Sequence, residues 1–156
     1  ERHENSTAVK LSDMVNDIFK SQAEIADKQH LTLQNEVAPS FTVTQDATVL
    51  RQILTNLIVN AVKYNRQDGL VKVSAMVTAS EFVVAVKDTG LGIPSEQQNR
   101  IFERFYRIDK SRNQTIPGTG LGLAIVNDLV NQAKGTIDLD SQVGVGTTIT
   151  VTLPLQ

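Results

Sequence analysis

The residues best suited to chemistry in this chain are three glycines at alternate positions in the stretch GTGLGLAIV. They are Gly118, Gly120 and Gly122, and an apolar helical pattern follows them directly. Bare backbone N–H groups at the start of a helix bind phosphate well, because the helix dipole places positive charge there. The stretch therefore predicts a phosphate site, unless the glycines serve only to pack the helix.

Two familiar phosphate loops can be excluded. The dinucleotide-binding fingerprint requires a buried strand immediately before its glycines, whereas the polar stretch DKSRNQTIP stands before these. Leu123 also occupies the place of the fingerprint's third glycine. A Walker A loop is absent, because no glycine in the sequence is followed by Lys and then Ser or Thr.

A polar stripe lies on the helical segment LRQILTNLIVNAVKYN. Asn56, Asn60 and Lys63 stand at i, i+4 and i+7, roughly opposite an apolar face that includes Leu54 and Leu57. Asn is a poor residue for a helix interior, because its amide competes with the backbone. The stripe is either a solvated helix face or a site where amide oxygens bind a hard cation and Lys binds phosphate.

Asp88 is a third candidate. It ends the apolar stretch FVVAVKD, and Gly90 and Gly92 follow it. A carboxylate at the end of a buried strand, next to glycines, suits a flat ligand that approaches the backbone closely. The alternative is an Asp that opens a glycine-rich turn. The presence of all three features in one short domain favours a ligand site.

The elements that must position these residues follow from the hydrophobic pattern. Ser12 is a plausible N-cap for a first helix, and Asp46 for a second that ends near Tyr64. Ser95 and Gln98 form a capping box for a brief helix. We expect a third helix from about residue 120 to 134, ended by a glycine at position 135.

The strands complete the expected fold. Residues 31–37 and 41–44 suggest a short hairpin around Pro39, and residues 1–9 a polar linker. Residues 106–117 are polar, lack periodicity and are typical of a mobile loop. The remaining expected strands cover residues 71–77, 82–86, 136–140 and 147–153. This order predicts an α/β fold, a two-layer sandwich of one mixed sheet with helices on one face.

Composition excludes several classes of protein. The 156 residues suit one domain with a full core, and 40% hydrophobic with 21% charged residues is ordinary for a globular chain. A formal net charge of -2 gives no basic footprint for nucleic acid. Without cysteine, disulfides and thiolate metal sites are excluded, and no apolar run is long enough for a membrane span. The chain begins without Met, so we expect a fragment of a longer protein.

Four stretches carry a family pattern in a fixed order. NLIVNAVKYN resembles the N box of sensor histidine kinases, DTGLGIP their first glycine box, IFERFYR their F box and GTGLGLAIV their second glycine box. GVGTTITVTLP resembles the closing strand of the family, so the resemblance covers most of the chain. It implies the Bergerat (GHKL) fold, an ATP-binding catalytic domain over residues 10–156, and a mobile lid over roughly residues 96–117.

The resemblance also implies roles at the phosphate end of an ATP site. Asn60 would hold Mg²⁺ that bridges the triphosphate, with Asn56 as a second polar contact. Lys63 would reach phosphate, and Arg107 the terminal phosphate, so that Asn60, Lys63 and Arg107 form the catalytic set. The residues of the second glycine box that would turn to the phosphates or border them are Gly118, Thr119, Gly120, Leu121, Gly122 and Leu123.

At the base end, the resemblance implies that Asp88 accepts a hydrogen bond from the adenine amino group. Tyr64 would flank the adenine or ribose, and Gly90 and Gly92 would let the base lie against backbone. Thr147 would act near the base through Asp88 or a water. Two further contacts implied at the cofactor are Ile93 and Tyr106.

The phosphoacceptor motif of the family is missing. His3 is followed by ENSTAV and His30 by LTLQ, and neither matches that motif. The implied partner is therefore a separate phosphoacceptor (dimerisation) helical domain that residues 1–9 would link to this one. A response regulator would act indirectly, and the whole protein would be a homodimer, with this domain on the cytoplasmic side of a membrane-anchored sensor.

Asn56 distinguishes the possible activities. Related ATPases carry a Glu one helical turn before the Mg²⁺-binding Asn, and here that position is Asn56. An amide does not accept a proton at neutral pH, so this helix offers no base for hydrolysis. The leading interpretation is a protein-histidine kinase; the alternatives are a Bergerat-fold ATPase that works as a conformational machine and a nucleotide-binding docking module.

Overall fold

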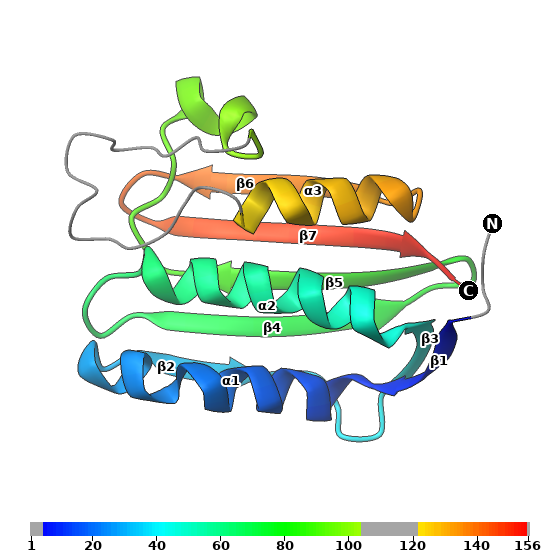
Figure 1. Cartoon of the computed structure of the whole chain (residues 1–156). Coiled ribbons are helices and arrows are strands. Elements are labelled where there is room, and N and C mark those ends of the chain that lie inside the picture. Colours follow the sequence, from blue (N-terminus) through cyan, green and yellow to red (C-terminus); the bar gives the residue numbers. More distant parts are fainter. Residues whose placement is uncertain (1–4, 104–121, 156) are drawn as a thin grey trace.

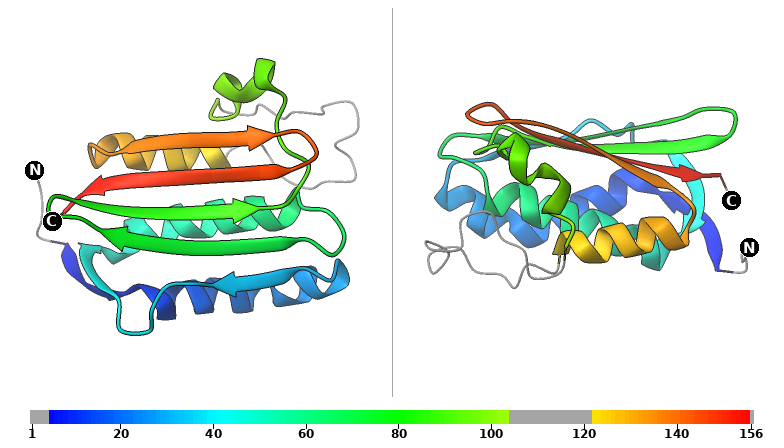
Figure 2. Two further views of the ribbon diagram at one scale, coloured as in Figure 1. Left: turned by 180° about the vertical axis from the view of Figure 1, so that it is seen from behind. Right: turned by 90° about the horizontal axis from the view of Figure 1, so that it is seen from above.

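A five-stranded mixed sheet, covered on one face by helices, forms the body of the protein in this computed structural model, which describes residues 5–103 and 122–155 (Figure 1). Seen from above, the helices form one layer and the sheet the other (Figure 2). In spatial order the strands are β2 (Thr32–Asn35), β4 (Leu70–Val77), β5 (Glu81–Asp88), β7 (Gly146–Pro154) and β6 (Thr136–Gln142). The expected two-layer α/β sandwich is confirmed.

Three α-helices and one short 3-10 helix accompany the sheet in the described residues. They are α1 (Leu11–Lys28), α2 (Ala47–Lys63), η1 (Ser95–Arg100) and α3 (Gly122–Gln132). None of the helices in these ranges is long and apolar enough to span a bilayer.

The expected hairpin around Pro39 is wrong. β2 pairs in parallel with β4, while β3 (Thr42–Asp46) pairs antiparallel with β1 (Ser6–Lys10) in a separate two-stranded sheet. A parallel pair needs a long crossover, and here β3 and α2 lie between β2 and β4 in the chain. Local turn chemistry therefore did not decide the pairing, because each strand has a more distant partner.

β1 was not expected, since residues 1–9 have the composition of a linker. Within β1 only Val9 is buried, and its antiparallel partner Val43 is buried as well. A peripheral ribbon with one buried apolar residue per strand leaves almost no hydrophobic pattern in the sequence. That residues 1–9 connect this domain to another remains a prediction.

Two of the expected helix caps differ from the structure. Asp46 does cap α2, accepting from the N–H groups of Thr48 and Val49 at 3.1 and 3.2 Å. Ser12 lies inside the first turn of α1, and its Oγ accepts from Asn35 Nδ2 at 3.1 Å instead. The capping box is also wrong, because the Gln98 side chain reaches β6.

The glycine at the end of α3 has a different role from the one expected. Lys134, with φ 64°, takes the left-handed conformation, and Gly135 follows it with its N–H bonded to the Val130 carbonyl at 2.9 Å. A Cβ at position 135 would collide with the Thr152 carbonyl. Gly135 is therefore required by the close approach of β7, not by its own dihedral angle.

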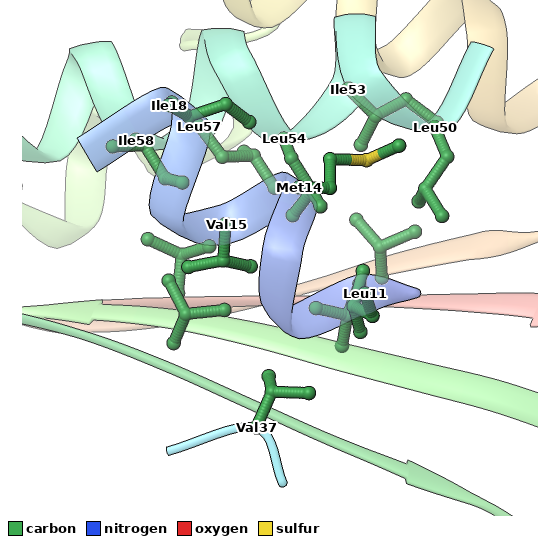
Figure 3. Packing of buried hydrophobic residues seen from close by; sticks show 14 of the residues in the cluster. Leu11, Met14, Val15, Ile18, Val37, Leu50, Ile53, Leu54, Leu57 and Ile58 are labelled. Atoms are coloured by element: carbon green, nitrogen blue, oxygen red, sulfur yellow. The ribbon is translucent and has the colours of Figure 1, made fainter. Parts of the chain in front are cut away.

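The core lies between the helices and the sheet, and α1 and α2 supply much of it (Figure 3). The expected apolar face of α2 is confirmed, since the residues on it are at most 3% exposed: Leu50, Leu54, Leu57, Ile58 and Ala61. Burial of this face fixes the rotation of α2 about its axis. The polar stripe is therefore turned away from the core.

Candidate functional site

The described candidate residues come from four segments that meet at one end of the sheet, on the left in Figure 1. These segments are the C-terminal half of α2, the loop after β5, the start of β7 and the start of α3. The N–H of Leu91, in the loop after β5, donates to the Tyr64 carbonyl at the end of α2 at 3.2 Å. A Cβ on Gly122, at the start of α3, would lie 3.4 Å from Asn56 Oδ1.

Asp88 is buried at the end of β5, with 9% of its surface exposed. Its Oδ1 accepts from the Gly90 N–H at 2.8 Å, and Thr147 stands opposite it on β7. Burial raises the pKa of the Asp88 carboxyl to about 6, although backbone hydrogen bonds from Gly90 and Thr147 partly oppose that shift. The carboxylate is ionised at neutral pH, so it is an acceptor for a ligand's donor group.

Gly90 and Gly92 are required by the protein's own packing. A Cβ on Gly90 would collide with the Tyr64 carbonyl and would lie 2.9 Å from Asp88 Oδ1. Gly92 has φ +76°, and a Cβ there would collide with the Gln142 carbonyl. These contacts hold the loop against α2 and against the turn between β6 and β7, beside Asp88.

The polar stripe on α2 is half-buried: its side chains are more exposed than those of a core face and less exposed than those of a fully solvated face. Asn56 Nδ2 donates to the Gln52 carbonyl at 2.8 Å, so Oδ1 is the amide atom left to face a ligand. The Asn60 amide makes no hydrogen bond with any residue in the described ranges. Lys63 Nζ lies 5.9 Å from the centre of the Tyr64 ring, a cation–π distance.

Part of the expected site falls outside the described residues. These positions are Tyr106, Arg107, Gly118, Thr119, Gly120 and Leu121, together with the expected loop at 106–117 and most of the lid at 96–117. Of the three alternate glycines, the structure describes Gly122 as the first residue of α3. Leu123 follows it and packs against the core, and Ile93 is buried.

Two residues that the sequence analysis did not single out hold this region together. Asn65 is buried directly after Tyr64; its Nδ2 donates to the Leu70 carbonyl at 3.0 Å and its Oδ1 accepts from the Arg66 N–H at 2.9 Å. Ser141 Oγ accepts from the Ile93 N–H at 2.8 Å. Asn65 continues the series of Asn residues on α2, so the sequence could have indicated it. Ser141 is a Ser at the end of a strand, which carries no distinct sequence signal.

Residues 45–156 match the family described as histidine kinase-, DNA gyrase B-, and HSP90-like ATPases. The chain belongs to this family. Sensor-like histidine kinase SenX3 of Mycobacterium tuberculosis is 36% identical over 154 residues, which cover 99% of this chain and 38% of SenX3. Sensor histidine kinase WalK of Bacillus subtilis is 42% identical over 134 residues, 84% of this chain and 22% of WalK.

Solved structures show the same fold. The catalytic domain of histidine kinase ThkA superposes with a TM-score of 0.79 at 23% identity, covering 96% of this chain and 95% of that one. Full-length ShkA in complex with AMPPNP gives a TM-score of 0.83 at 28% identity, covering 96% of this chain and 31% of ShkA. The expected histidine kinase-type ATP-binding domain is confirmed at the level of the family, and the chain spans well under half of its curated relatives.

Proposed function

We propose that this domain of the histidine kinase-like ATPase family binds Mg-ATP and transfers the γ-phosphoryl group to a histidine on a separate phosphoacceptor domain. The observation that carries the proposal is the buried Asp88 carboxylate beside bare Gly90 backbone, next to a helix whose polar stripe consists of amides and a lysine. The sensor kinase relatives supply the choice of histidine as the acceptor.

At the base end, the ionised Asp88 carboxylate accepts a hydrogen bond from the adenine amino group. The carboxylate already accepts from the backbone N–H groups of Gly90 and Thr147, and its two oxygens offer further lone pairs for a ligand's donor. Tyr64, the residue that caps α2, flanks the adenine or ribose, and Thr147 stands opposite Asp88 on the neighbouring strand. The loop after β5 packs against α2 and keeps bulky side chains out of the space in which we place the base.

At the phosphate end, the residues fit a Mg²⁺ ion that the triphosphate brings with it. Mg²⁺ takes oxygen ligands and is usually shared between protein and phosphate. Among the described residues, neither Asn56 Oδ1 nor the Asn60 amide has a hydrogen-bond partner, so both could supply an oxygen ligand from the same side of α2. When bound, Mg²⁺ neutralises charge on the phosphates. Lys63 adds positive charge at the same end, and Arg107 does so from the part of the chain beyond the described ranges.

Transfer to histidine is favoured over transfer to water by the sequence of α2. The helix ATVLRQILTNLIVNAVK contains no Asp or Glu, so it offers no carboxylate to activate water. An amide at Asn56 does not accept a proton at neutral pH. Catalysis then consists of positioning and charge neutralisation, as in other phosphoryl transfers, and the histidine nitrogen is itself the nucleophile.

The partners follow from this chemistry. The phosphoacceptor helices would belong to the same sensor kinase, which would be a homodimer. The phosphohistidine would pass its phosphoryl group to a response regulator. Because ATP is cytoplasmic, we place this domain on the cytoplasmic side of a membrane-anchored sensor.

Two measurements test the proposal. Calorimetric titration of this chain with ATP should show binding that Mg²⁺ strengthens. The longer protein, incubated with ATP labelled in the γ-phosphate, should acquire label that is lost in acid, as a phosphohistidine is. Binding without any transfer would favour a docking module, and absence of binding would overturn the proposal.

A further inference from the structure

The hydroxyl of Ser141, on β6, joins the loop after β5 to the start of β7. Its Oγ accepts from the Ile93 N–H at 2.8 Å. The same oxygen lies 3.2 Å from the Gly146 carbonyl and 2.7 Å from Thr147 Oγ1. Thr147 is the residue that faces Asp88 across β5 and β7. One side chain therefore touches the two segments that border the proposed base site.

Counting protons shows what Ser141 does to Thr147. A hydroxyl has one proton and two lone pairs, and Ile93 uses one of the lone pairs. If Ser141 donates to the Gly146 carbonyl, Thr147 donates to Ser141 and keeps only acceptor capacity for a ligand. If Ser141 donates to Thr147, the Thr147 proton is available for a ligand. In either case the bond to Ser141 restricts the orientation of the Thr147 hydroxyl.

The loop itself is held on the same turn of the sheet. The Gly144 N–H donates to the Leu91 carbonyl at 3.0 Å. Gln98 Nε2 donates to the carbonyls of Ile93, at 2.8 Å, and of Ser141, at 3.2 Å. With the Leu91 N–H on Tyr64, both backbone polar groups of Leu91 and of Ile93 have partners. Ser141 is thus part of a defined network beside Asp88.

We propose that Ser141 is a positioning residue for base selection: its hydroxyl orients Thr147 next to Asp88 and holds the Ile93 backbone, so that an adenine is preferred over a base with a carbonyl at the same position. This inference rests on the proposed function, because it concerns the same base site. Ser141 does not itself touch the nucleotide; it acts through Thr147.

The test compares ATP with ITP, which carries a carbonyl where ATP carries the amino group. Calorimetric titration of this chain gives the ratio of the ITP dissociation constant to the ATP dissociation constant, which is above 1 when ATP is preferred. Ser141→Ala should reduce that ratio roughly three- to tenfold, the range expected for one neutral hydrogen bond. Ser141→Thr retains the hydroxyl and should keep the ratio within about twofold of the parent.

Thr147→Val tests whether Ser141 acts through Thr147. This change keeps the shape of the side chain and the bonds of Ser141 to Ile93 and Gly146. It should reduce the ratio by a similar factor. Combining Ser141→Ala with Thr147→Val should reduce the ratio no further than either change alone. Thr150→Val, on the same strand but away from the site, is the matched control and should leave the ratio unchanged.

Two results would overturn the inference while leaving the proposed function intact. One is a Ser141→Ala protein that binds ATP and ITP more weakly by the same factor, which is the signature of a purely structural bond. The other is a Thr147→Val protein with the ratio of the parent, and this result decides the matter even if Ser141→Ala does not fold. A parent chain that binds no ATP would instead refute the proposed function.

Discussion

Asp88 and Thr147 face each other across the antiparallel pair of β5 and β7, and the Thr147 backbone N–H donates to the Asp88 carboxylate. Thr147 is 8% exposed and Asp88 9%, so the contact is made away from bulk water. The carboxylate is therefore desolvated without a positively charged partner among the groups that shift its pKa. A buried carboxylate of this kind costs stability and is typical of a binding or catalytic site.

The first prediction concerns stability against pH. The pKa of Asp88 is about 6 in the folded protein and 3.8 in its ordinary state, so the unfolded chain loses this proton first. The contribution of Asp88 to the free energy of unfolding therefore falls by up to about 3 kcal/mol as pH rises from about 4 to about 6. Asp88→Asn should be more stable than the parent at pH 7.5 and equal to it near pH 4. Denaturant unfolding across this range measures the difference; an equal pH dependence of both proteins would contradict the burial argument.

The second prediction concerns base choice. A carboxylate only accepts hydrogen bonds, so it matches the adenine amino group and opposes the carbonyl of guanine. An opposed polar group costs about 1–3 kcal/mol, and more if charged, so ATP should be preferred over GTP by roughly 10-fold to over 100-fold. Asp88→Asn should weaken ATP binding and narrow the preference. If the variant discriminates as sharply as the parent in calorimetry, Asp88 is only a turn residue.

The third prediction concerns the α2 stripe. Asn60→Ala should leave the thermal midpoint nearly unchanged, because the amide has no hydrogen bond within the described residues and faces away from the core. The variant should lose the strengthening of ATP binding by Mg²⁺, and with it phosphotransfer in the longer protein. Titration with and without Mg²⁺ separates the two effects, and normal Mg²⁺ dependence would remove Asn60 from the metal site.

The fourth prediction concerns the opposite face of α2. Leu57 is 1% exposed and lies in the core beside Ile18 of α1 (Figure 3), so Leu57→Ala should cost about 2–5 kcal/mol. Gln52→Ala, on the exposed side of the same helix, should change the free energy of unfolding by no more than about 0.5 kcal/mol. Similar values for the two variants in denaturant unfolding would contradict the assigned orientation of α2.

The sequence was informative where a residue's partners are near it in the chain or where its pattern repeats. The cap at Asp46, the buried face of α2 and the strands β4 and β5 follow from local spacing, and the structure confirms them. The strands that pair with β2 and β3 lie far from them in the chain, and no local sequence pattern encodes such a pairing. The Gln98 side chain likewise bonds to the Ser141 carbonyl, 43 residues away, and not to its own helix.

The same distinction applies to the candidate site. Asn56, Asn60 and Asp88 were recognisable because polar residues on an apolar background need a reason. Ser141 was not, because its role depends on three segments meeting at one oxygen. The glycines of the loop after β5 were recognised for a ligand, while the structure shows that the loop's own contacts with Tyr64 and Gln142 already require them.

The most direct test of the account is the fate of the γ-phosphate of ATP in a single turnover. The isolated chain and the longer protein with the proposed phosphoacceptor domain are each given one equivalent of γ-labelled ATP and Mg²⁺. We expect the label to appear on a histidine of the longer protein, and the isolated chain to bind ATP but release inorganic phosphate very slowly. Brisk, Mg²⁺-dependent release of phosphate by the isolated chain, with no label on the longer protein, would contradict the account and identify a hydrolase.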